Sequence, residues 1–427
     1  MLKKLPIRVI VIGAGDRGNV YARYSIGSPD ELKIVGVAEA DDLKLKIFSE
    51  KYNIPKENIF KDYKEVFSRE QFADAVFITT PDRLHYEPAL MAYKKGYHIL
   101  LEKPICNNPI DLIKLSNLVK NNSEQLFMIC HVLRYTNFFG LIKRIIDSKE
   151  LGDIVCIQHN ENIGNIHFSH SFVRGNWSNS DRSSPIILAK TCHDFDILLW
   201  FTGKKIKRIS SFGSLTFFTK RNKPKGAPLR CLDGCPVEKD CPYSAIKIYL
   251  SENKSWFRTV ITPELSFESL YKALKEGPYG VCVFQSDNNV ADHQVTNILL
   301  EGDTTIAFTL CGLTSEISRT LKIMGTKAQL RASTYKNEIE ITEFSTNNVK
   351  RIQVGFIEGF HYGGDVNIVK SFIKALTTGN FKEYNLTSFE DSVMSHLAAF
   401  AAEKARLENK VIDFDLYLKE LNNEVKS

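Results

Sequence analysis

A glycine-rich turn near the start of the chain has the residue types and spacing of a phosphate-binding site. Its six residues are Gly13-Ala14-Gly15-Asp16-Arg17-Gly18. Glycines at its first, third and sixth positions allow a tight turn, bring the backbone close to a pyrophosphate and let the following helix pack on the strand. Glu39 lies 26 residues after Gly13, where a carboxylate can accept hydrogen bonds from ribose hydroxyls and repel a 2′-phosphate. The pattern predicts a dinucleotide site that prefers NAD to NADP, although FAD or a turn without any ligand would fit the same residues.

The elements around this turn alternate between short apolar runs and helical patterns. The apolar runs are 7–12, 34–38, 75–79 and 98–101. Such alternation is typical of βαβ units, which build a parallel sheet with helices on both faces. Ligands of this architecture bind at the carboxyl ends of the strands, which is where the glycine turn falls. We therefore expect a doubly wound α/β Rossmann domain over residues 1–130.

After about residue 152, the pattern changes to longer runs of alternating apolar and polar residues. These runs predict strands at 155–160, 206–212, 280–285, 297–300, 304–309, 320–324 and 338–344. We expect them to form a large, mainly antiparallel open sheet in an α+β domain over residues 131–387. The end of the chain, 388–427, carries apolar residues at helical spacing and is expected to return toward the first domain.

Length and composition argue against several classes of protein. With 427 residues the chain is long enough for two hydrophobic cores. The net charge of +6 comes with lysines spread along the chain instead of gathered in a stripe, which argues against nucleic-acid binding. No stretch approaches the roughly 20 apolar residues needed to cross a bilayer, and the first residues lack the pattern of a signal peptide. We expect a cytoplasmic protein without membrane contact.

Three cysteines lie close together in a segment rich in proline, glycine and lysine. They are Cys231, Cys235 and Cys241, in an excursion at 219–242 from the predicted sheet. Three thiolates can hold a tetrahedral zinc ion if a fourth ligand joins them, and Cys282 and Cys192 are candidates for it. An iron–sulfur cluster is the weaker prediction, because it usually requires four thiolates and the spacing fits neither common pattern. The three cysteines could also form a disulfide or stay buried as free thiols.

Further motifs follow the later strands and the start of the second domain. They are Thr79-Thr80-Pro81-Asp82-Arg83-Leu84-His85, Leu100-Leu101-Glu102-Lys103-Pro104, His131-Val132-Leu133-Arg134-Tyr135, Val173-Arg174-Gly175-Asn176-Trp177 and Lys190-Thr191-Cys192-His193-Asp194-Phe195-Asp196. As an ordered set they resemble the Gfo/Idh/MocA family of glucose-fructose oxidoreductase, inositol dehydrogenase and rhizopine-catabolism proteins. The resemblance implies NAD-dependent hydride transfer at a hydroxyl of a sugar, polyol or sugar derivative. It also implies a homo-oligomer, either a dimer or a tetramer, that pairs through the open sheet.

Such a reaction needs a base for the hydroxyl proton and a positive group near the developing oxyanion. The resemblance assigns orientation of the hydroxyl to Lys103 and proton removal to His193. Many family members have an aspartate four residues before this histidine, whereas here that position is Ala189 with Lys190 next to it, so Lys190 enters the predicted relay. The predicted cofactor residues beyond the glycine turn are Glu39, Thr79, Thr80, Pro81, His85, Glu102 and Lys103. The predicted substrate residues are His131, Arg134, Tyr135, His170, Arg174 and Trp177.

Two other functions would use the same residues. A glycoside hydrolase with tightly bound NAD would oxidise a sugar hydroxyl transiently, eliminate the glycosidic leaving group and then return the hydride. It would need a second acid or base, for which Tyr135, Tyr362 and His170 are candidates. A non-catalytic sensor would only bind the dinucleotide, and the presence of Lys103 and His193 argues against it.

Overall fold

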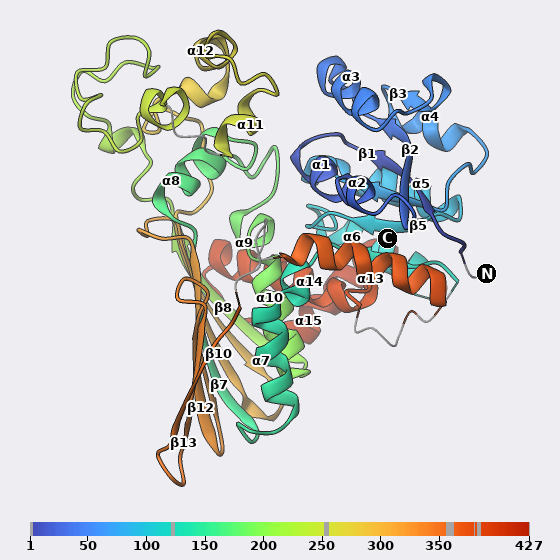
Figure 1. Ribbon diagram of the computed structural model, residues 1–427. Helices are drawn as coiled ribbons and strands as arrows, with labels where there is room; N and C mark the ends of the chain where they lie inside the picture. Colours follow the sequence, from blue (N-terminus) through green and yellow to red (C-terminus); the bar gives the residue numbers. More distant parts are fainter. Residues whose placement is uncertain are drawn as a thin grey trace.

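The computed structural model describes residues 3–120, 124–251, 256–355, 363–379, 381 and 386–426. Its N-terminal part is a sheet of six parallel strands in the order β3-β2-β1-β4-β5-β6 (Figure 1). The strands are β1 (Ile7–Ile12), β2 (Leu32–Ala38), β3 (Ile59–Phe60), β4 (Ala75–Ile78), β5 (His98–Leu101) and β6 (Phe127–Ile129). Helices cover both faces, which explains why these strands are nearly continuous apolar runs. The predicted doubly wound fold is confirmed, and its order reverses between β1 and β4, where such folds bind ligands.

The connections of this sheet are helices with well-defined starts. They are α1 (Asp16–Ala22), α2 (Tyr24–Gly27), α3 (Asp42–Lys51), η1 (Lys56–Asn58), α4 (Tyr63–Ser68), η2 (Asp82–Leu84), α5 (Tyr86–Lys94) and α6 (Pro109–Val119). Asp41, Asp62 and Asn108 cap α3, α4 and α6, because their side chains accept hydrogen bonds from backbone N–H groups of the first turn. These caps fix where α3, α4 and α6 begin and therefore the loops at the carboxyl ends of the strands that precede them.

One helix on this sheet comes from the far end of the sequence. Helix α13 (Gly364–Thr378) shares a hydrophobic core with β1 and β4, and the rings of Phe372 and Phe77 lie 5.7 Å apart. From the sequence these residues were expected in the second domain, as they follow its strands. The first sheet thus takes part of its cover from a segment about 230 residues beyond its last strand, β6.

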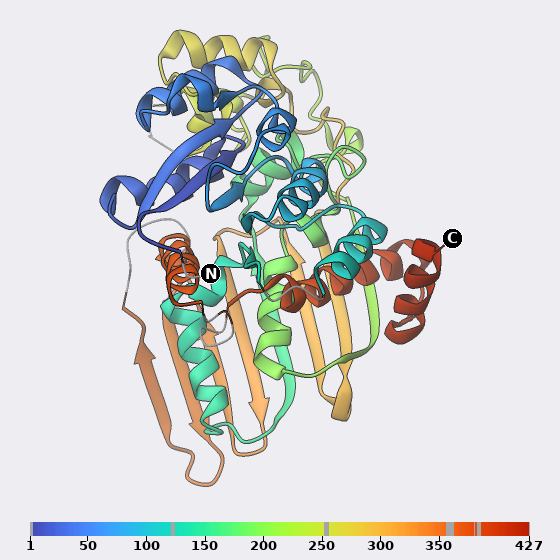
Figure 2. The same ribbon diagram turned by 90° about the vertical axis from the view of Figure 1, so that its right-hand side faces the viewer.

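The second sheet has nine strands in the order β14-β13-β12-β11-β7-β10-β9-β8-β15. They are β7 (Ile154–Asn162), β8 (Ile206–Ser214), β9 (His293–Leu300), β10 (Thr305–Cys311), β11 (Ser318–Gly325), β12 (Ala328–Ser333), β13 (Glu338–Glu343), β14 (Val349–Gln353) and β15 (Ile412–Asp413). All pairs are antiparallel except β7 with β10, as expected for a mainly antiparallel sheet. In Figure 2, α7 (Asn137–Asp147) and α10 (Cys192–Thr202) lie across one face of this sheet. The opposite face carries no helix of the described residues (Figure 1).

The long helix α14 (Phe389–Glu408) packs against both parts of the molecule. It contacts β8 and α10 on the second sheet, and α6 and β6 of the first domain. The remaining elements near this junction are η3 (Val132–Tyr135), α8 (Asn165–Phe168), η4 (Ser169–Arg174), α9 (Ile186–Ala189) and α15 (Phe414–Lys426). No helix in the described ranges is both long enough and apolar enough to span a membrane.

The cysteine-rich excursion is larger than the sequence indicated. Between β8 and β9 it includes η5 (Lys220–Asn222), η6 (Ile246–Leu250), α11 (Phe257–Ile261), α12 (Phe267–Glu276) and η7 (Pro278–Gly280), and it stands apart from the first domain in Figure 1. The strand predicted at 280–285 is wrong. That run forms a turn, since its backbone pairs only briefly with the loop at 229–231 and its apolar side chains pack inside the excursion.

Candidate functional site

The glycine turn after β1 has no space for a side chain at Gly13 or Gly18, whereas it is open at Gly15. Gly13 has φ +94°, and a Cβ there would meet the carbonyl oxygen of Thr79 at 2.8 Å. A Cβ at Gly18 would meet the Gly13 carbonyl oxygen at 2.3 Å, so this glycine lets α1 pack on the strand. At Gly15, by contrast, a Cβ would meet no atom within 4 Å, and no side chain caps the start of α1. The open side of the turn can therefore receive a pyrophosphate.

Glu39 follows β2 and is held beside this turn by the backbone. Its Oε2 accepts a hydrogen bond from the N–H of Ala14 at 2.7 Å, and its Oε1 accepts one from the N–H of Asp41 at 3.0 Å. The two bonds fix the carboxylate at the carboxyl end of β2. This is the place at which an acidic residue meets the ribose in dinucleotide folds.

Arg17 forms an internal ion pair within the domain. Its Nε donates to Glu102 at 2.6 Å and its terminal nitrogen donates to Asp365 of α13, also at 2.6 Å, and to the Tyr21 hydroxyl. Burial raises the pKa of Asp16 beside it. Burial also acts to raise the pKa of Glu102, but Arg17 and Lys103 outweigh this effect and lower it. Arg17 and Glu102 thus tie the glycine turn to the end of β5.

The motif after β4 fixes neighbouring loops to one another. The Thr79 hydroxyl donates to the Gly13 carbonyl at 2.6 Å, and the Thr80 hydroxyl donates to the Leu84 carbonyl at 2.9 Å. Pro81 precedes η2, and the ring of His85 lies between the carbonyl oxygens of Thr80 and Pro104 at 2.7 and 2.5 Å. These residues therefore shape the loops around the predicted cofactor site through contacts with the backbone.

Lys103 reaches from the first domain to the second. Its Nζ donates a hydrogen bond to the carbonyl oxygen of Ala189 at 2.8 Å. Ala189 ends α9, and His193 lies in the first turn of α10 with 6% of its surface exposed. The charge of Lys103 also adds to the burial that lowers the pKa of Lys190. The structure therefore brings the three predicted catalytic residues to one junction between the domains.

Lys190 belongs to a buried network of charges. Its Nζ lies 3.2 Å from Glu161 of β7, and Arg319 of β11 bridges Glu161 and Asp194 at 2.9 and 2.7 Å. Asp194 also accepts a hydrogen bond from His159 at 2.7 Å. Burial lowers the pKa of Lys190 and raises that of Glu161, so a proton moves between them more easily than between exposed groups. The sequence did not indicate Glu161 or Arg319, because only strand pairing brings them together.

Three histidine rings gather at the same junction. The ring of His131 lies 5.5 Å from that of His193 and 5.4 Å from that of His396 of α14. The Nε2 of His396 accepts a hydrogen bond from the N–H of Ile105, two residues after Lys103, at 3.0 Å. Burial lowers the pKa of His396 to about 3, and burial lowers that of His131 as well. Both rings are therefore neutral near pH 7. The sequence did not indicate His396, whose one signal is a histidine on the apolar face of a helix.

Two predicted substrate residues, Arg134 and Tyr135, make internal contacts next to the junction. Arg134 donates two hydrogen bonds to Asp196 at 2.7 and 2.6 Å. The hydroxyl of Tyr135 accepts a hydrogen bond from the N–H of Thr387 at 3.0 Å, and burial raises its pKa to about 12. Tyr362 lies outside the described residues. The Tyr135 hydroxyl is thus already bonded to the Thr387 backbone next to the junction.

The other predicted substrate residues do not gather in one place. The indole N–H of Trp177 donates to both carboxylate oxygens of Asp82 at 3.1 Å, which joins it to the loop after β4. His170 bonds the Tyr249 hydroxyl at 2.9 Å inside the excursion, where burial lowers its pKa to about 3. Arg174 also points into the excursion, where it donates to two backbone carbonyls. Of these three, Trp177 is the residue that lies against the Rossmann domain.

The expected zinc site is not formed as a group of ligands around one point. Within the described ranges, no three His, Cys, Asp or Glu side chains converge closely enough to hold a metal ion. Cys231, Cys235 and Cys241 are free thiols, and so are Cys282 and Cys192. Cys192 lies at the start of α10, whereas the other four lie in the excursion.

The N-terminal domain matches a known protein family. Residues 7–130 match the model of the Gfo/Idh/MocA proteins, which is described as an oxidoreductase family with an NAD-binding Rossmann fold. Over these residues, the chain is similar to the Gfo/Idh/MocA family. The matched range contains the glycine turn, Glu39 and the Glu102-Lys103-Pro104 motif.

Two of the curated relatives align over more residues than this range contains. The Bacillus subtilis protein YteT is 21% identical over 351 residues, which are 78% of this chain and 80% of YteT. Inositol 2-dehydrogenase of Salmonella typhimurium is 20% identical over 209 residues, or 49% of this chain and 58% of that enzyme. D-glucoside 3-dehydrogenase of Escherichia coli is 31% identical over 105 residues, or 24% and 29% of the two chains.

Solved structures of Gfo/Idh/MocA type share the whole fold. Scyllo-inositol dehydrogenase from Lactobacillus casei, solved with NAD(H) and scyllo-inositol, superposes with a TM-score of 0.66 at 17% identity, over 97% of this chain and 100% of that one. An oxidoreductase from Agrobacterium radiobacter, solved with NAD⁺, L-tartaric acid and magnesium, gives 0.69 at 14% identity, over 96% and 99%. These likenesses establish the arrangement of both domains.

The described residues fit the dinucleotide of the Gfo/Idh/MocA family. The turn is open in front of Gly15, and Glu39 is fixed at the end of the next strand. These residues therefore fit NAD, and Lys103 follows β5 at the carboxyl end of the sheet, where such folds bind the dinucleotide.

Proposed function

We propose that the chain is an NAD-dependent oxidoreductase that transfers a hydride between nicotinamide and a hydroxyl of a sugar, polyol or sugar derivative. The observation that carries this proposal is the junction at which Lys103 bonds the Ala189 carbonyl beside Lys190 and His193. The relatives support the substrate class, because they are named inositol 2-dehydrogenase and D-glucoside 3-dehydrogenase.

In this proposal the protein side chains bind and move the hydroxyl proton, and NAD, when bound, would supply the hydride acceptor. The ammonium of Lys103 donates a hydrogen bond to the reacting hydroxyl oxygen and stabilises the negative charge that develops on it. The imidazole of His193 removes the hydroxyl proton, since a neutral ring can act as the base. Lys190 then passes a proton between the site and Glu161, which the lowered pKa of Lys190 and the raised pKa of Glu161 favour.

A panel of substrates tests the reaction. Purified protein is mixed with NAD⁺ and free inositols, sugars, polyols or aryl glycosides, and both NADH absorbance and aryl release are followed. We expect NADH to accumulate with at least one polyol or free sugar. Aryl release without net NADH would instead establish the NAD-dependent hydrolase, and tight NAD binding with neither signal would point to the sensor.

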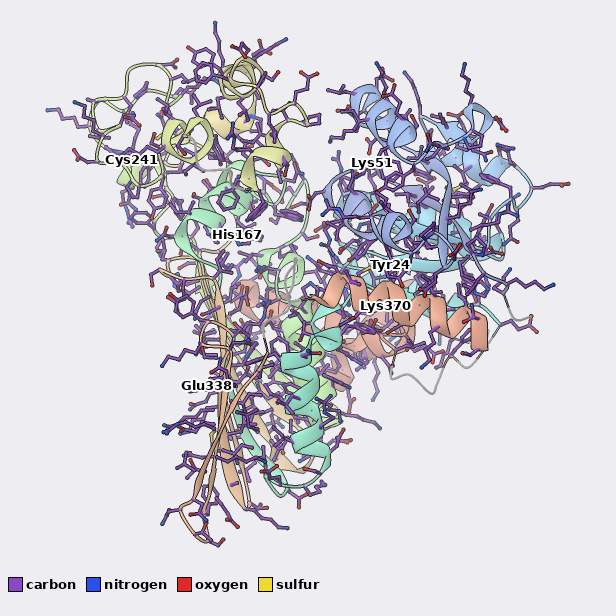
Figure 3. All side chains as sticks on the ribbon, in the orientation of Figure 1. Tyr24, Lys51, His167, Cys241, Glu338 and Lys370 are labelled. Atoms are coloured by element: carbon purple, nitrogen blue, oxygen red, sulfur yellow. The ribbon has the colours of Figure 1, made fainter. Side chains whose placement is uncertain are left out.

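A pair of matched variants distinguishes a loss of catalysis from a loss of folding. Lys103→Met should lower kcat/KM about a hundredfold or more while NAD still binds, because the positive group at the oxyanion is lost. Lys370→Met removes an exposed lysine of α13, which is labelled in Figure 3, and should leave kcat/KM unchanged. Equal activity of the Lys103→Met variant and the unmodified protein would contradict the proposal.

We also infer that the protein acts in the cytoplasm as a homo-oligomer, a dimer or a tetramer, that pairs through the open face of the second sheet. Support for the pairing comes from apolar side chains exposed on that face, including Phe212 and Val295, which are cross-strand neighbours. The zinc predicted at Cys231, Cys235 and Cys241 stays a prediction.

A further inference from the structure

The loops after β4 and β5 of the first domain are bonded to one stretch of the second domain, residues 175–185, which we call the connecting segment. Trp177 of this segment donates its indole N–H to both carboxylate oxygens of Asp82 at 3.1 Å. The side-chain amide of Asn107 donates to the carbonyl oxygen of Ser183 at 2.8 Å. The connecting segment leads directly into α9 and α10, where the proposed proton-transfer residues lie.

The second domain holds the connecting segment from its other side, through the loop before β9. The backbone N–H of Ser180 donates to the side-chain oxygen of Asn289 at 2.7 Å, and the N–H of Asn289 donates to the Ser178 carbonyl at 3.0 Å. Arg182 forms an ion pair with Asp287 at 2.5 Å. With bonds on both sides, the segment cannot shift relative to the first domain without breaking some of them.

The Asp82 carboxylate depends on the indole for its hydrogen bonds. Asp82 is 5% exposed, and in the part of the chain that the structure describes, the N–H of Trp177 is the one donor to its carboxylate. A buried carboxylate that loses its donor must reach water or take up a proton, and both cost free energy. Loss of the indole N–H would therefore draw the loop after β4 away from the connecting segment.

This bond lies close to the proposed reaction site. The charges of both Asp82 and Lys103 act on the thiol of Cys192, in the first turn of α10. Burial raises the pKa of this thiol to about 12, while Lys103 acts to lower it and Asp82 to raise it. Lys103 also bonds the last carbonyl of α9. The first domain thus holds the chain on both sides of α9, before it at Trp177 and at its end.

We propose that Trp177 and Asp82 form a positioning pair, which keeps α9 and the start of α10 in register with Lys103. The inference rests on the proposed function, because register matters where Lys103 and His193 act on one hydroxyl. Displacement of reacting groups by about 1 Å can lower a rate on the order of a hundredfold. Trp177, which the sequence assigned to the substrate, acts instead through the protein.

Steady-state kinetics of matched variants tests the pair. Trp177→Phe keeps an aromatic ring but removes the N–H, and we expect kcat to fall about tenfold or more while KM changes less than about threefold. Asp82→Ala should show a similar fall, whereas Asp82→Asn keeps a carbonyl oxygen as acceptor and should keep most of the activity. Trp200→Phe is the control and should leave both constants unchanged, because its indole N–H has no partner among the described residues.

The losses in the two damaging variants should not multiply. A protein with both Trp177→Phe and Asp82→Ala should lose no more activity than either single variant, because both changes remove the same bond. Losses that multiply would overturn the pair. A raised KM with unchanged kcat in Trp177→Phe, together with no effect of Asp82→Ala, would place the indole on the substrate and overturn it as well.

Hydrogen–deuterium exchange makes the test independent of any substrate. Exchange of the amides of residues 186–194 should speed up in Trp177→Phe and Asp82→Ala, and stay unchanged in Asp82→Asn and Trp200→Phe. Such a pattern in a protein without dehydrogenase activity would uphold the pair and contradict the proposed function. Unchanged exchange in the first two variants would overturn the pair even in an active enzyme. If Trp177→Phe does not fold, the comparison of Asp82→Ala with Asp82→Asn decides.

Discussion

Both carboxylate oxygens of Glu39 are held by backbone N–H groups, those of Ala14 and Asp41. The charge therefore stays at the end of β2 whether or not a ligand is present. A fixed negative charge there repels the 2′-phosphate of NADP, whereas the ribose hydroxyls of NAD can donate to it. Cofactor choice should depend on this one side chain.

Glu39→Ser should shift the ratio of kcat/KM for NADP over NAD upward by about tenfold or more, because it removes the repulsion. A tenfold change corresponds to about 1.4 kcal/mol. Asp42→Asn removes an exposed charge at the start of α3, three residues after Glu39, and should leave the ratio unchanged. Steady-state kinetics with both cofactors measures the effect, and an equal ratio in all three proteins would rule out Glu39 as the selector.

The sequence could predict those site residues that sit in short motifs after strands. Lys103, Glu39 and the glycines follow apolar runs directly, so local pattern was enough to place them. It could not predict Glu161 or His396, because these reach the junction only through sheet pairing and through a helix near the end of the chain. Nor could it predict that one predicted substrate residue, Arg174, turns toward the cysteines.

At the level of elements, α14 closes the junction between the domains. Its residue His396 accepts the N–H of Ile105 through Nε2 and bonds the carbonyl of Ser392 through Nδ1. This pair of bonds requires the neutral ring. Protonation of Nε2 would remove the acceptor for the loop that carries Lys103, so the docking of α14 is linked to pH.

Stability should fall as pH falls below about 6.5. The pKa of His396 and that of His170 are lowered to about 3 in the folded protein, while 6.5 is the ordinary value in the unfolded chain. Between these values the unfolded chain binds more protons, so acid favours unfolding, by up to about 1.4 kcal/mol per pH unit and group. His396→Gln should show a smaller loss of urea resistance between pH 7 and 4.5. The unmodified protein, measured in parallel, gives the reference slope.

For the whole molecule, one face of the second sheet carries no helix of the described residues (Figure 1). Phe212 is 63% exposed, Val155 is 52% exposed and Val295, paired with Phe212, is 39% exposed. Phe212 and Val295 pair on adjoining strands, whereas Val155 lies on β7, toward the other end of the strands. An exposed apolar pair of this kind is typical of an interface. A second copy of the same face would bury them.

Phe212→Glu should lower the molar mass measured by light scattering to that of a single chain or a smaller assembly, because it places a charge in the proposed apolar contact. Tyr335→Glu changes an even more exposed aromatic residue outside the paired strands and should keep the mass. An unchanged mass for Phe212→Glu would show that the interface does not include this face.

The two sheets were predictable at this scale, because each has its own pattern of apolar residues. The boundary between the two domains was harder to predict, because α13 follows the second sheet in sequence but packs on the first sheet. The excursion between β8 and β9 was underestimated, as its helices are short and its core is small.

The partner of the Lys103 ammonium is a main-chain atom, the carbonyl oxygen of Ala189. That atom is present whatever amino acid the gene encodes at codon 189. A missense change there can alter the shape of the junction, but it cannot delete the acceptor itself. Natural selection is therefore able to vary the side chain at this position, within the space that surrounds it, while the lysine keeps its anchor from one generation to the next.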